Sequence, residues 1–157
     1  MKVIVIGPRG KMGKLITQVA AERDDMELVA GVAPAGRDYV GQDLGMVALI
    51  GRNLGVPVVD DLAAVIDACD VIIDFSTREN ALKVLDLAVK HGKALVCGTT
   101  GFCEEEFARF KEAAMTIPML YAANTSKLVN IMNKLLEMVT KTLGEDADIE
   151  ILEMHDQ

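Results

Sequence analysis

The stretch Val3-Ile4-Val5-Ile6-Gly7-Pro8-Arg9-Gly10-Lys11-Met12-Gly13 decides the fold. Its first four residues are β-branched and apolar, a run that is typical of a strand buried on both faces. Three glycines follow, and glycine lets the backbone turn tightly and approach a ligand. The helix predicted next points its free N–H groups and its positive end at this turn, which suits a phosphate. The stretch therefore predicts a dinucleotide site at the first strand–helix turn of a Rossmann-type sheet.

The glycine spacing differs from the common G-x-G-x-x-G pattern. Arg9 occupies the place of the middle glycine, so the motif here is G-x-x-G-x-M-G. A strand–helix turn with no ligand is the alternative interpretation. The position of the motif, directly after the first strand, favours nucleotide binding.

Composition limits the classes of partner. The 157 residues are enough for one domain with a hydrophobic core, and 51% of them are apolar, which argues against disorder. The net charge of −8 argues against nucleic acid or an anionic membrane as the main partner. No apolar run is long enough to span a bilayer.

Cysteine and histidine usage gives a further expectation. The three cysteines, Cys69, Cys97 and Cys103, are odd in number and form no C-x-x-C pair, so we expect free thiols in a reducing compartment. The sequence starts directly with a strand and shows no signal-peptide segment. A cytoplasmic protein is therefore expected. The spacing of the Asp, Glu and His residues predicts no metal site.

Strand-like and helix-like segments alternate along the chain. Strands are predicted over residues 3–6, 27–32, 56–59, 70–75, 94–97, 118–122 and 148–154. Helices are predicted over 12–20, 79–91, 104–115 and 128–143, with one more after Asp60 or Asp61 and a short helical turn near 47–50 in a long loop. This alternation predicts an α/β fold with a doubly wound parallel sheet.

The end of the second predicted strand bears on cofactor choice. In a dinucleotide fold an acidic residue about 20 residues after the motif often holds the adenosine ribose hydroxyls. Ala33 stands at that position, while Arg37 follows four residues later and Lys11 lies in the glycine turn. The missing acid and the nearby bases favour NADPH, whose 2′-phosphate needs positive charge. The alternative is that Arg37 is an ordinary loop arginine.

Five groups of residues occur in an order that points to a known enzyme family. They are G-x-x-G-x-M-G at 7–13, Asp74-Phe75-Ser76 with Glu79, Gly98-Thr99-Thr100-Gly101-Phe102, Ala123-Asn124 with Ser126 and Asn130, and Ile149-Glu150-Ile151 with Glu153 and His155. With these motifs the sequence resembles the 4-hydroxy-tetrahydrodipicolinate reductase family, also called dihydrodipicolinate reductase, over essentially the whole chain.

The resemblance implies an activity and a set of partners. The family reduces a cyclic imine-type substrate with NADH or NADPH in diaminopimelate and lysine biosynthesis, and its members are usually homotetramers. We therefore expect a small-molecule substrate, NADPH or NADH as cofactor, and a homo-oligomer.

The resemblance also assigns roles to residues. The 7–13 turn would hold the pyrophosphate, Lys11 matches a basic position that favours the 2′-phosphate, and the loops at 75–76, 98–101 and 123–126 would line the nicotinamide half. The candidate cofactor-binding residues are Gly7, Arg9, Gly10, Lys11, Met12, Gly13, Arg37, Phe75, Ser76, Gly98, Thr99, Thr100, Ala123 and Asn124.

His155 is the candidate catalytic residue. It matches the first His of the family's E-x-H-H-x-x-K motif, in the region tied to substrate protonation, and a hydride addition must be completed by a proton. The sequence departs from the family at the second His, where Asp156 stands, and at the Lys, which would fall beyond residue 157. Arg9 replaces a small residue, and its side chain would either block the pyrophosphate or help to neutralise it.

The expected organisation is a dinucleotide-binding domain over residues 1–127, and the truncated start of a substrate or oligomerisation domain over residues 128–157. The chain would be either the N-terminal piece of a longer protein or a short, diverged relative. Two other functions stay open. One is a non-catalytic Rossmann-type interaction module that associates through Leu128, Ile131 and Leu135 on the long helix. The other is an NAD(P)-dependent oxidoreductase that acts on another small acid.

Overall fold

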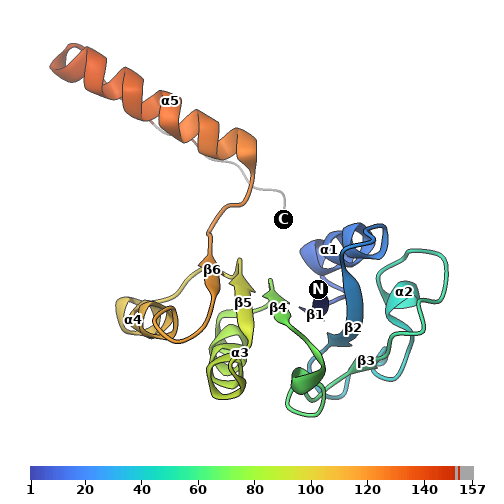
Figure 1. Ribbon diagram of the computed structural model, residues 1–157. Helices are drawn as coiled ribbons and strands as arrows, with labels where there is room; N and C mark the ends of the chain where they lie inside the picture. The colour runs from blue at the N-terminus through green and yellow to red at the C-terminus, as the bar shows by residue number, and fades with distance from the viewer. Residues whose placement is uncertain (151, 153–157) are drawn as a thin grey trace. The chain divides into compact units, whose positions relative to one another are not determined.

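The apolar run at the start of the chain forms strand β1 (Lys2–Ile6), and Val3 to Ile6 are buried. In the computed structural model, which describes residues 1–150 and 152, β1 lies in the middle of a six-stranded sheet. The chain divides into two compact units, Met1–Ala123 and a second that begins at Asn124. The sheet belongs to the first unit (Figure 1).

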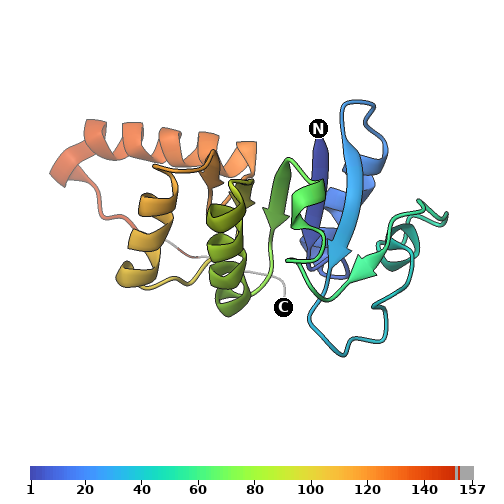
Figure 2. The ribbon, with the colours of Figure 1, turned by 60° about the horizontal axis from the view of Figure 1, so that its bottom comes forward.

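All strand pairs of the sheet are parallel, in the order β3-β2-β1-β4-β5-β6. The other strands are β2 (Glu27–Val32), β3 (Val58–Val59), β4 (Val71–Asp74), β5 (Ala94–Cys97) and β6 (Met119–Tyr121). In Figure 2 the arrowheads of β2 and β4 point the same way. The predicted strands over 27–32 and 94–97 are confirmed residue for residue.

Helices cover both faces of the sheet, which confirms the predicted doubly wound α/β fold. Helix α1 (Lys11–Ala21) lies on one face, and α3 (Arg78–His91) and α4 (Glu104–Ala113) lie on the other (Figure 1). Helix α3 ends at Gly92, which has a φ of +62°, the left-handed conformation that favours glycine at this position.

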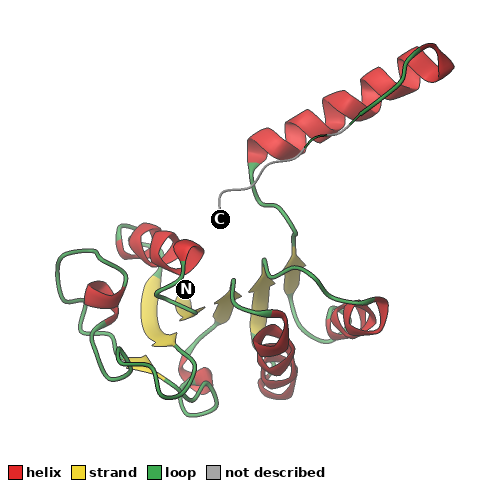
Figure 3. Ribbon diagram, turned by 180° about the vertical axis from the view of Figure 1, so that it is seen from behind, coloured by secondary structure: helices red, strands yellow, loops and turns green. Residues whose placement is uncertain are grey.

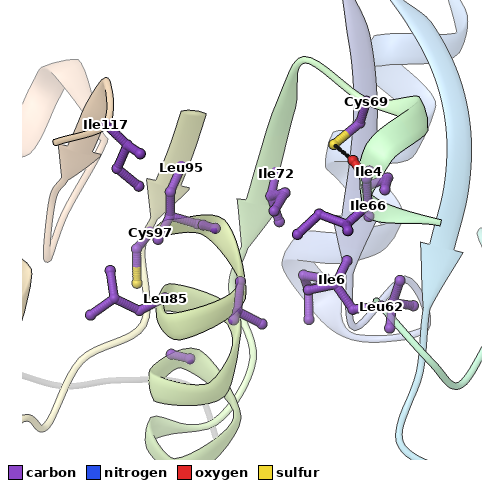
Figure 4. Packing of buried hydrophobic residues seen from close by; sticks show 14 of the residues in the cluster. Ile4, Ile6, Leu62, Ile66, Cys69, Ile72, Leu85, Leu95, Cys97 and Ile117 are labelled. Atoms are coloured by element: carbon purple, nitrogen blue, oxygen red, sulfur yellow. Dashed lines mark hydrogen bonds between the residues drawn. The ribbon is translucent and has the colours of Figure 1, made fainter. Parts of the chain in front are cut away.

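Alternate residues of β1 belong to two different hydrophobic clusters, because successive side chains of a strand point to opposite faces of the sheet. Ile4 and Ile6 join the larger cluster with Leu85 of α3 and Phe110 of α4. Figure 4 shows Ile4, Ile6, Ile72, Leu95 and Leu85 within this cluster. Val3 and Val5 face the other side, where Ile16 of α1 packs against them. The strand is therefore buried on both faces, as its sequence predicts.

The segment between β3 and β4 differs from the prediction of a full helix. Leu62 and Ile66 are buried as expected, and the Ile66 N–H donates to the Leu62 carbonyl at 2.9 Å. Val65, however, has a φ of −122°, outside the helical range, and only a short 3₁₀ turn, η1 (Ile66–Ala68), follows. The Asp61 carboxylate accepts the Ala63 N–H at 2.9 Å, but this bond closes a turn, because the N-cap residue of η1 is Val65 and has no side-chain cap.

Much of the chain between β2 and β4 is loop (Figure 3). Its short helix α2 (Leu44–Val47) begins three residues earlier than predicted, because the Asp43 carboxylate accepts the Gly45 N–H at 2.8 Å and caps the helix there. The other carboxylate contacts of Asp43 hold the end of the same loop. Leu54, Gly55 and Val56 donate their backbone N–H groups to it at 2.9, 2.7 and 3.2 Å.

The three cysteines differ in their exposure to solvent. Cys69 and Cys97 are buried and Cys103, at the start of α4, is exposed; none is in a disulfide. Burial raises the pKa of the Cys97 thiol to about 11 and also raises the pKa of Cys69. The two buried thiols are therefore poor nucleophiles.

The second unit contains helix α5 (Lys127–Leu143) and the short 3₁₀ turn η2 (Gly144–Asp146). Within this unit no residue of α5 is buried. Residues 148–150 form no strand, so the strand predicted over 148–154 is wrong there, and residues 151, 153 and 154 lie outside the described residues. In the described part of the chain, none of the helices has the length and apolar character needed to cross a bilayer.

The four amides held by Asp43 give a testable prediction. Desolvation tends to raise the pKa of this carboxyl, but the four backbone N–H groups lower it overall. Its stabilising contribution is therefore present above the ordinary value of 3.8 and is lost as the pH falls through the lowered pKa. We expect Asp43→Ala to lower the free energy of unfolding by about 1–3 kcal/mol at pH 7.

Urea denaturation of the wild type and Asp43→Ala between pH 3 and pH 7 measures this effect. The difference between the two proteins should shrink below about pH 4. Asp38→Ala is the matched control, because its exposed carboxylate makes a single ion pair. A difference that stays constant with pH would contradict the role given to the ionised Asp43.

Candidate functional site

The carboxyl ends of β1, β2 and β4 meet at one edge of the sheet. Ile6, the last residue of β1, pairs with Val32 on one side and with Asp74 on the other, so the three strands end in register. A cleft of about 670 Å³ opens there. Its lining comes from four segments: Ile6, Gly7 and Gly10; Val32, Ala33, Pro34, Ala35, Arg37 and Tyr39; Asp60, Asp61 and Leu62; and Phe75, Ser76, Thr77, Asn80, Lys83, Val84 and Leu87. Ligands of open parallel sheets bind at this edge.

The glycine turn forms one wall of the cleft. Gly7 has a φ of +68° and donates its N–H to the Val32 carbonyl at 2.8 Å, and Gly10 donates to the Gly7 carbonyl at 3.0 Å. A Cβ on Gly13 would collide with the Gly7 carbonyl and lie 2.9 Å from the Pro8 Cα. Glycine at position 13 therefore allows α1 to start directly against the turn.

The N-terminus of α1 has no capping side chain. Gly10 is its N-cap residue, and its first turn contains no acidic residue. Three other α-helices of the described residues begin with a side-chain cap, from Asp43 in α2, Thr77 in α3 and Ser126 in α5. In α4, Glu106 of the first turn accepts the N–H of the N-cap residue Cys103. The first N–H groups of α1 thus have no side-chain acceptor and are suited to an anionic group such as a phosphate.

A buried carboxylate joins the two loops on the other side of β1. Asp74 is fully buried, and its oxygens accept the Ser76 hydroxyl at 2.6 Å and the Thr99 hydroxyl at 3.0 Å. The Thr99 oxygen in turn accepts the Ser76 N–H at 3.0 Å, and Asn80 donates to the Ser76 hydroxyl at 3.0 Å. This network fixes the loop after β4 to the loop after β5.

Desolvation raises the pKa of Asp74, although hydrogen bonds from Ser76, Thr99 and Cys97 oppose the shift. No cation among the described residues pairs with this carboxylate. A buried carboxylate of this kind at a strand end is a common feature of functional sites.

The Phe75 ring lies over Gly98. A Cβ on Gly98 would collide with the ring, so glycine is needed at the end of β5 for this packing. At the far end of the same loop, the Phe102 ring packs 4.7 Å from the Phe110 ring and 6.0 Å from the Tyr121 ring, measured between centroids. Both ends of the Gly98–Phe102 segment are therefore anchored by aromatic side chains.

The structure brings several predicted cofactor residues together. Gly7, Gly10, Arg37, Phe75 and Ser76 line the cleft. Thr99 is buried beside Ser76, whereas Lys11 and Met12 are exposed in the first turn of α1 and Thr100 is exposed after β5.

Other predicted residues lie elsewhere. Arg9 leaves the glycine turn, and its guanidinium pairs with Asp38 at 2.8 Å. Ala123 ends the first unit and Asn124 begins the second, so their predicted role in the cofactor pocket remains a prediction. The predicted catalytic residue, His155, lies outside the described residues.

Sequence reasoning missed part of the lining. Thr77, Asn80, Lys83, Val84 and Leu87 belong to one side of α3 and its cap, with spacings of three or four residues. Because this spacing continues from Ser76, the helical period could have identified them. Asp60 and Asp61, predicted only as helix caps, also face the cleft.

A second hollow, of about 300 Å³, lies between α3 and α4 on the outside of the unit. Its walls include the ion pair between Asp86 and Arg109, and it lies away from the strand ends. It offers no grouping of reactive side chains. Within the described residues no cluster of three or more His, Cys, Asp or Glu side chains is arranged to hold a metal ion.

The family model and the curated relatives that match this chain belong to one enzyme family. The family model for the N-terminus of dihydrodipicolinate reductase matches residues 1–125. The 4-hydroxy-tetrahydrodipicolinate reductase of Hahella chejuensis is 41% identical over 154 residues, and that of Geobacter metallireducens is 44% identical over 155 residues. These matches cover 98% and 99% of this chain, but only 57% and 58% of the two relatives.

A solved structure agrees with these matches. The dipicolinate-bound dihydrodipicolinate reductase from Paenisporosarcina sp. TG-14 superimposes with a TM-score of 0.71 at 26% identity. The superposition covers 89% of this chain and 53% of that protein. The chain thus spans a little more than half the length of the proteins it resembles.

The buried Asp74 gives a second prediction. Because its pKa is raised in the folded protein, ionising it opposes folding as the pH rises above the ordinary value of 3.8. Asparagine can keep hydrogen bonds to both hydroxyls without a charge. We therefore expect the stability of Asp74→Asn relative to the wild type to increase as the pH rises from 3 to 7.

Urea unfolding of both proteins across this pH range measures the effect. Asp74→Ala is the comparison variant, because it leaves the Ser76 and Thr99 hydroxyls without their acceptor and should lower the free energy of unfolding by about 1–3 kcal/mol. A relative stability of Asp74→Asn that falls with rising pH would show that the carboxylate is favoured in the fold.

Proposed function

Because the chain belongs to the dihydrodipicolinate reductase family, we propose that it provides the dinucleotide-binding part of an enzyme that reduces 4-hydroxy-tetrahydrodipicolinate with NADPH or NADH in lysine biosynthesis. The observation that carries the proposal is the uncapped N-terminus of α1 behind the glycine turn. It lies at the edge of a cleft of about 670 Å³, within the usual size range of ligand pockets.

The residues of the cleft fit the parts of a dinucleotide. Gly7, Gly10 and the first turn of α1, with Lys11, Met12 and Gly13, would hold the pyrophosphate. Arg37 follows β2, beside which such folds hold the adenosine ribose. Phe75, Ser76 and the Gly98–Thr100 loop, with Ala123 and Asn124, would line the nicotinamide half. When bound, the dihydronicotinamide supplies the hydride.

The remaining steps belong to the rest of the enzyme. We propose His155 as the residue that protonates the reduced substrate, and residues 128–157 as the start of the substrate or oligomerisation domain. In support, α5 has an exposed apolar side that needs a partner surface. Its exposed apolar residues are Leu128, Ile131, Met132, Leu135, Leu136, Met138, Val139 and Leu143. A homo-oligomer is proposed on the same ground.

The cofactor proposal is tested by placing an aspartate at the N-cap position of α1. The backbone of Gly10 has a φ of −66° and a ψ of 164°, which aspartate adopts readily as an N-cap residue. In Gly10→Asp the side chain would accept the free N–H groups and repel a phosphate. We expect the wild type to bind NADPH or NADH with a dissociation constant in the micromolar range, about −8 kcal/mol. We expect Gly10→Asp to bind at least tenfold more weakly.

Gly10→Ala is the matched control. Its Cβ makes the same 3.2 Å contact with the Gly7 carbonyl but brings no charge, so its binding should stay within a few-fold of the wild type. Calorimetric titration measures both constants, and thermal unfolding checks that each variant folds. Tight binding by Gly10→Asp would mean that the pyrophosphate lies elsewhere, and no binding by the wild type would contradict the cofactor proposal for this chain.

A further inference from the structure

Asp74 is the last residue of β4 and lies between two other strand ends. It pairs with Ile6 of β1 on one side and with Cys97 of β5 on the other. Its side chain is fully buried, so a ligand in the cleft does not reach the carboxylate. Any effect of Asp74 on a ligand must therefore pass through the groups that are hydrogen-bonded to it.

The two carboxylate oxygens each accept a hydroxyl from a different loop. Oδ1 accepts the Ser76 hydroxyl at 2.6 Å, and Oδ2 accepts the Thr99 hydroxyl at 3.0 Å. Because a hydroxyl has a single proton, the carboxylate fixes the orientation of both hydroxyl groups. The Thr99 oxygen also accepts the Ser76 N–H at 3.0 Å, so the three residues form a closed set of hydrogen bonds, here called the Asp74 link.

The Asp74 link extends a contact between the two loops that starts at the strand ends. There the Gly98 N–H donates to the Asp74 carbonyl at 2.9 Å, and the Phe75 ring occupies the space in which a Cβ of Gly98 would stand. Phe75 and Ser76 line the cleft. The link therefore determines how far the cleft wall after β4 lies from the loop after β5.

The other end of the cleft is lined by a different segment. Residues 32–35, 37 and 39, at the end of β2 and after it, form that part of the lining. Among the described residues, the side-chain hydrogen bonds of Asp74 involve Ser76, Cys97 and Thr99, and none involves that segment. Loss of the link should therefore change one end of the cleft and leave the other end intact.

We propose that Asp74 is a positioning residue for the nicotinamide half of the dinucleotide, because it holds the loops after β4 and β5 at a fixed spacing. This inference rests on the proposed cofactor function, in which Phe75, Ser76 and the Gly98–Thr100 loop line that half. Loops that are already fixed lose little conformational entropy when a ligand binds between them, so fixing them increases affinity. The pyrophosphate and the adenosine contact other segments and do not depend on the link.

The test compares each dinucleotide with its fragment that lacks nicotinamide, which is ADP-ribose for NADH and 2′-phospho-ADP-ribose for NADPH. Calorimetry gives the dissociation constants for the wild type, Asp74→Ala and Asp74→Asn. Asp74→Ala should weaken dinucleotide binding about tenfold and leave fragment binding within about twofold of the wild type. Asparagine can keep the bonds to both hydroxyls, so Asp74→Asn should restore dinucleotide binding to within about threefold of the wild type.

A second variant removes the same link from the other loop. Thr99→Val takes away the hydroxyl with little change in volume, and it should reproduce the effect of Asp74→Ala. Asp43→Ala is the matched control, because it also removes a carboxylate that holds a loop, but one outside the cleft lining. It should leave the ratio of the dinucleotide and fragment constants unchanged. Thermal unfolding checks that each variant folds, and Thr99→Val decides the test if Asp74→Ala does not fold.

Four outcomes would overturn the positioning role while dinucleotide binding still stands. They are equal weakening of dinucleotide and fragment when the link is removed, unchanged binding of both, equal affinity of the wild type for both, and no restoration by Asp74→Asn. A wild type that binds neither the dinucleotides nor their fragments would overturn the proposed function, and this inference with it.

Discussion

The parallel pairing of β1 with β2 and β4 is the constraint on which the site depends. Ile6 lies opposite both Val32 and Asp74, so three strands end together at one edge. The Gly7 N–H continues this ladder by one hydrogen bond to Val32, which ties the glycine turn to β2. Because β1 is buried on both faces and held on both sides, the turn has a rigid base. The cleft lining is then supplied by the segments that follow those strand ends.

The sequence was sufficient to predict most of the sheet, for a physical reason. The run Ala94–Cys97, for example, is short, apolar and bounded by Lys93 and Gly98, so its type and ends are encoded locally. The helix predicted after Asp60 or Asp61 is wrong, because the spacing of Leu62, Val65 and Ile66 fits one helical turn but the backbone of Val65 is not helical. Apolar spacing over a single turn does not distinguish a full α-helix from a short turn of the chain.

The site was predicted less completely than the fold, because its details depend on partners far away in the sequence. The direction of the Arg9 side chain is set by Asp38, 29 residues later. The role of Asp74 depends on Thr99, 25 residues later, and no local pattern marks a carboxylate at a strand end as buried. Glycine positions are more informative. At Gly7, Gly13 and Gly98 a Cβ would be strained or would collide with a neighbour, which explains why the glycine motifs at 7–13 and 98–101 predict the position of the site.

The unequal environments of the three cysteines have a practical consequence. Burial holds Cys69 and Cys97 as thiols that react poorly, while Cys103 is exposed at the start of α4. Under native conditions a maleimide dye would therefore attach at one position without any engineering. That position directly follows the Gly98–Phe102 segment, one end of which is linked through Thr99 to Asp74 and Ser76. Among the cysteines of this chain, Cys103 is thus the single accessible attachment point for a fluorescent reporter next to that segment.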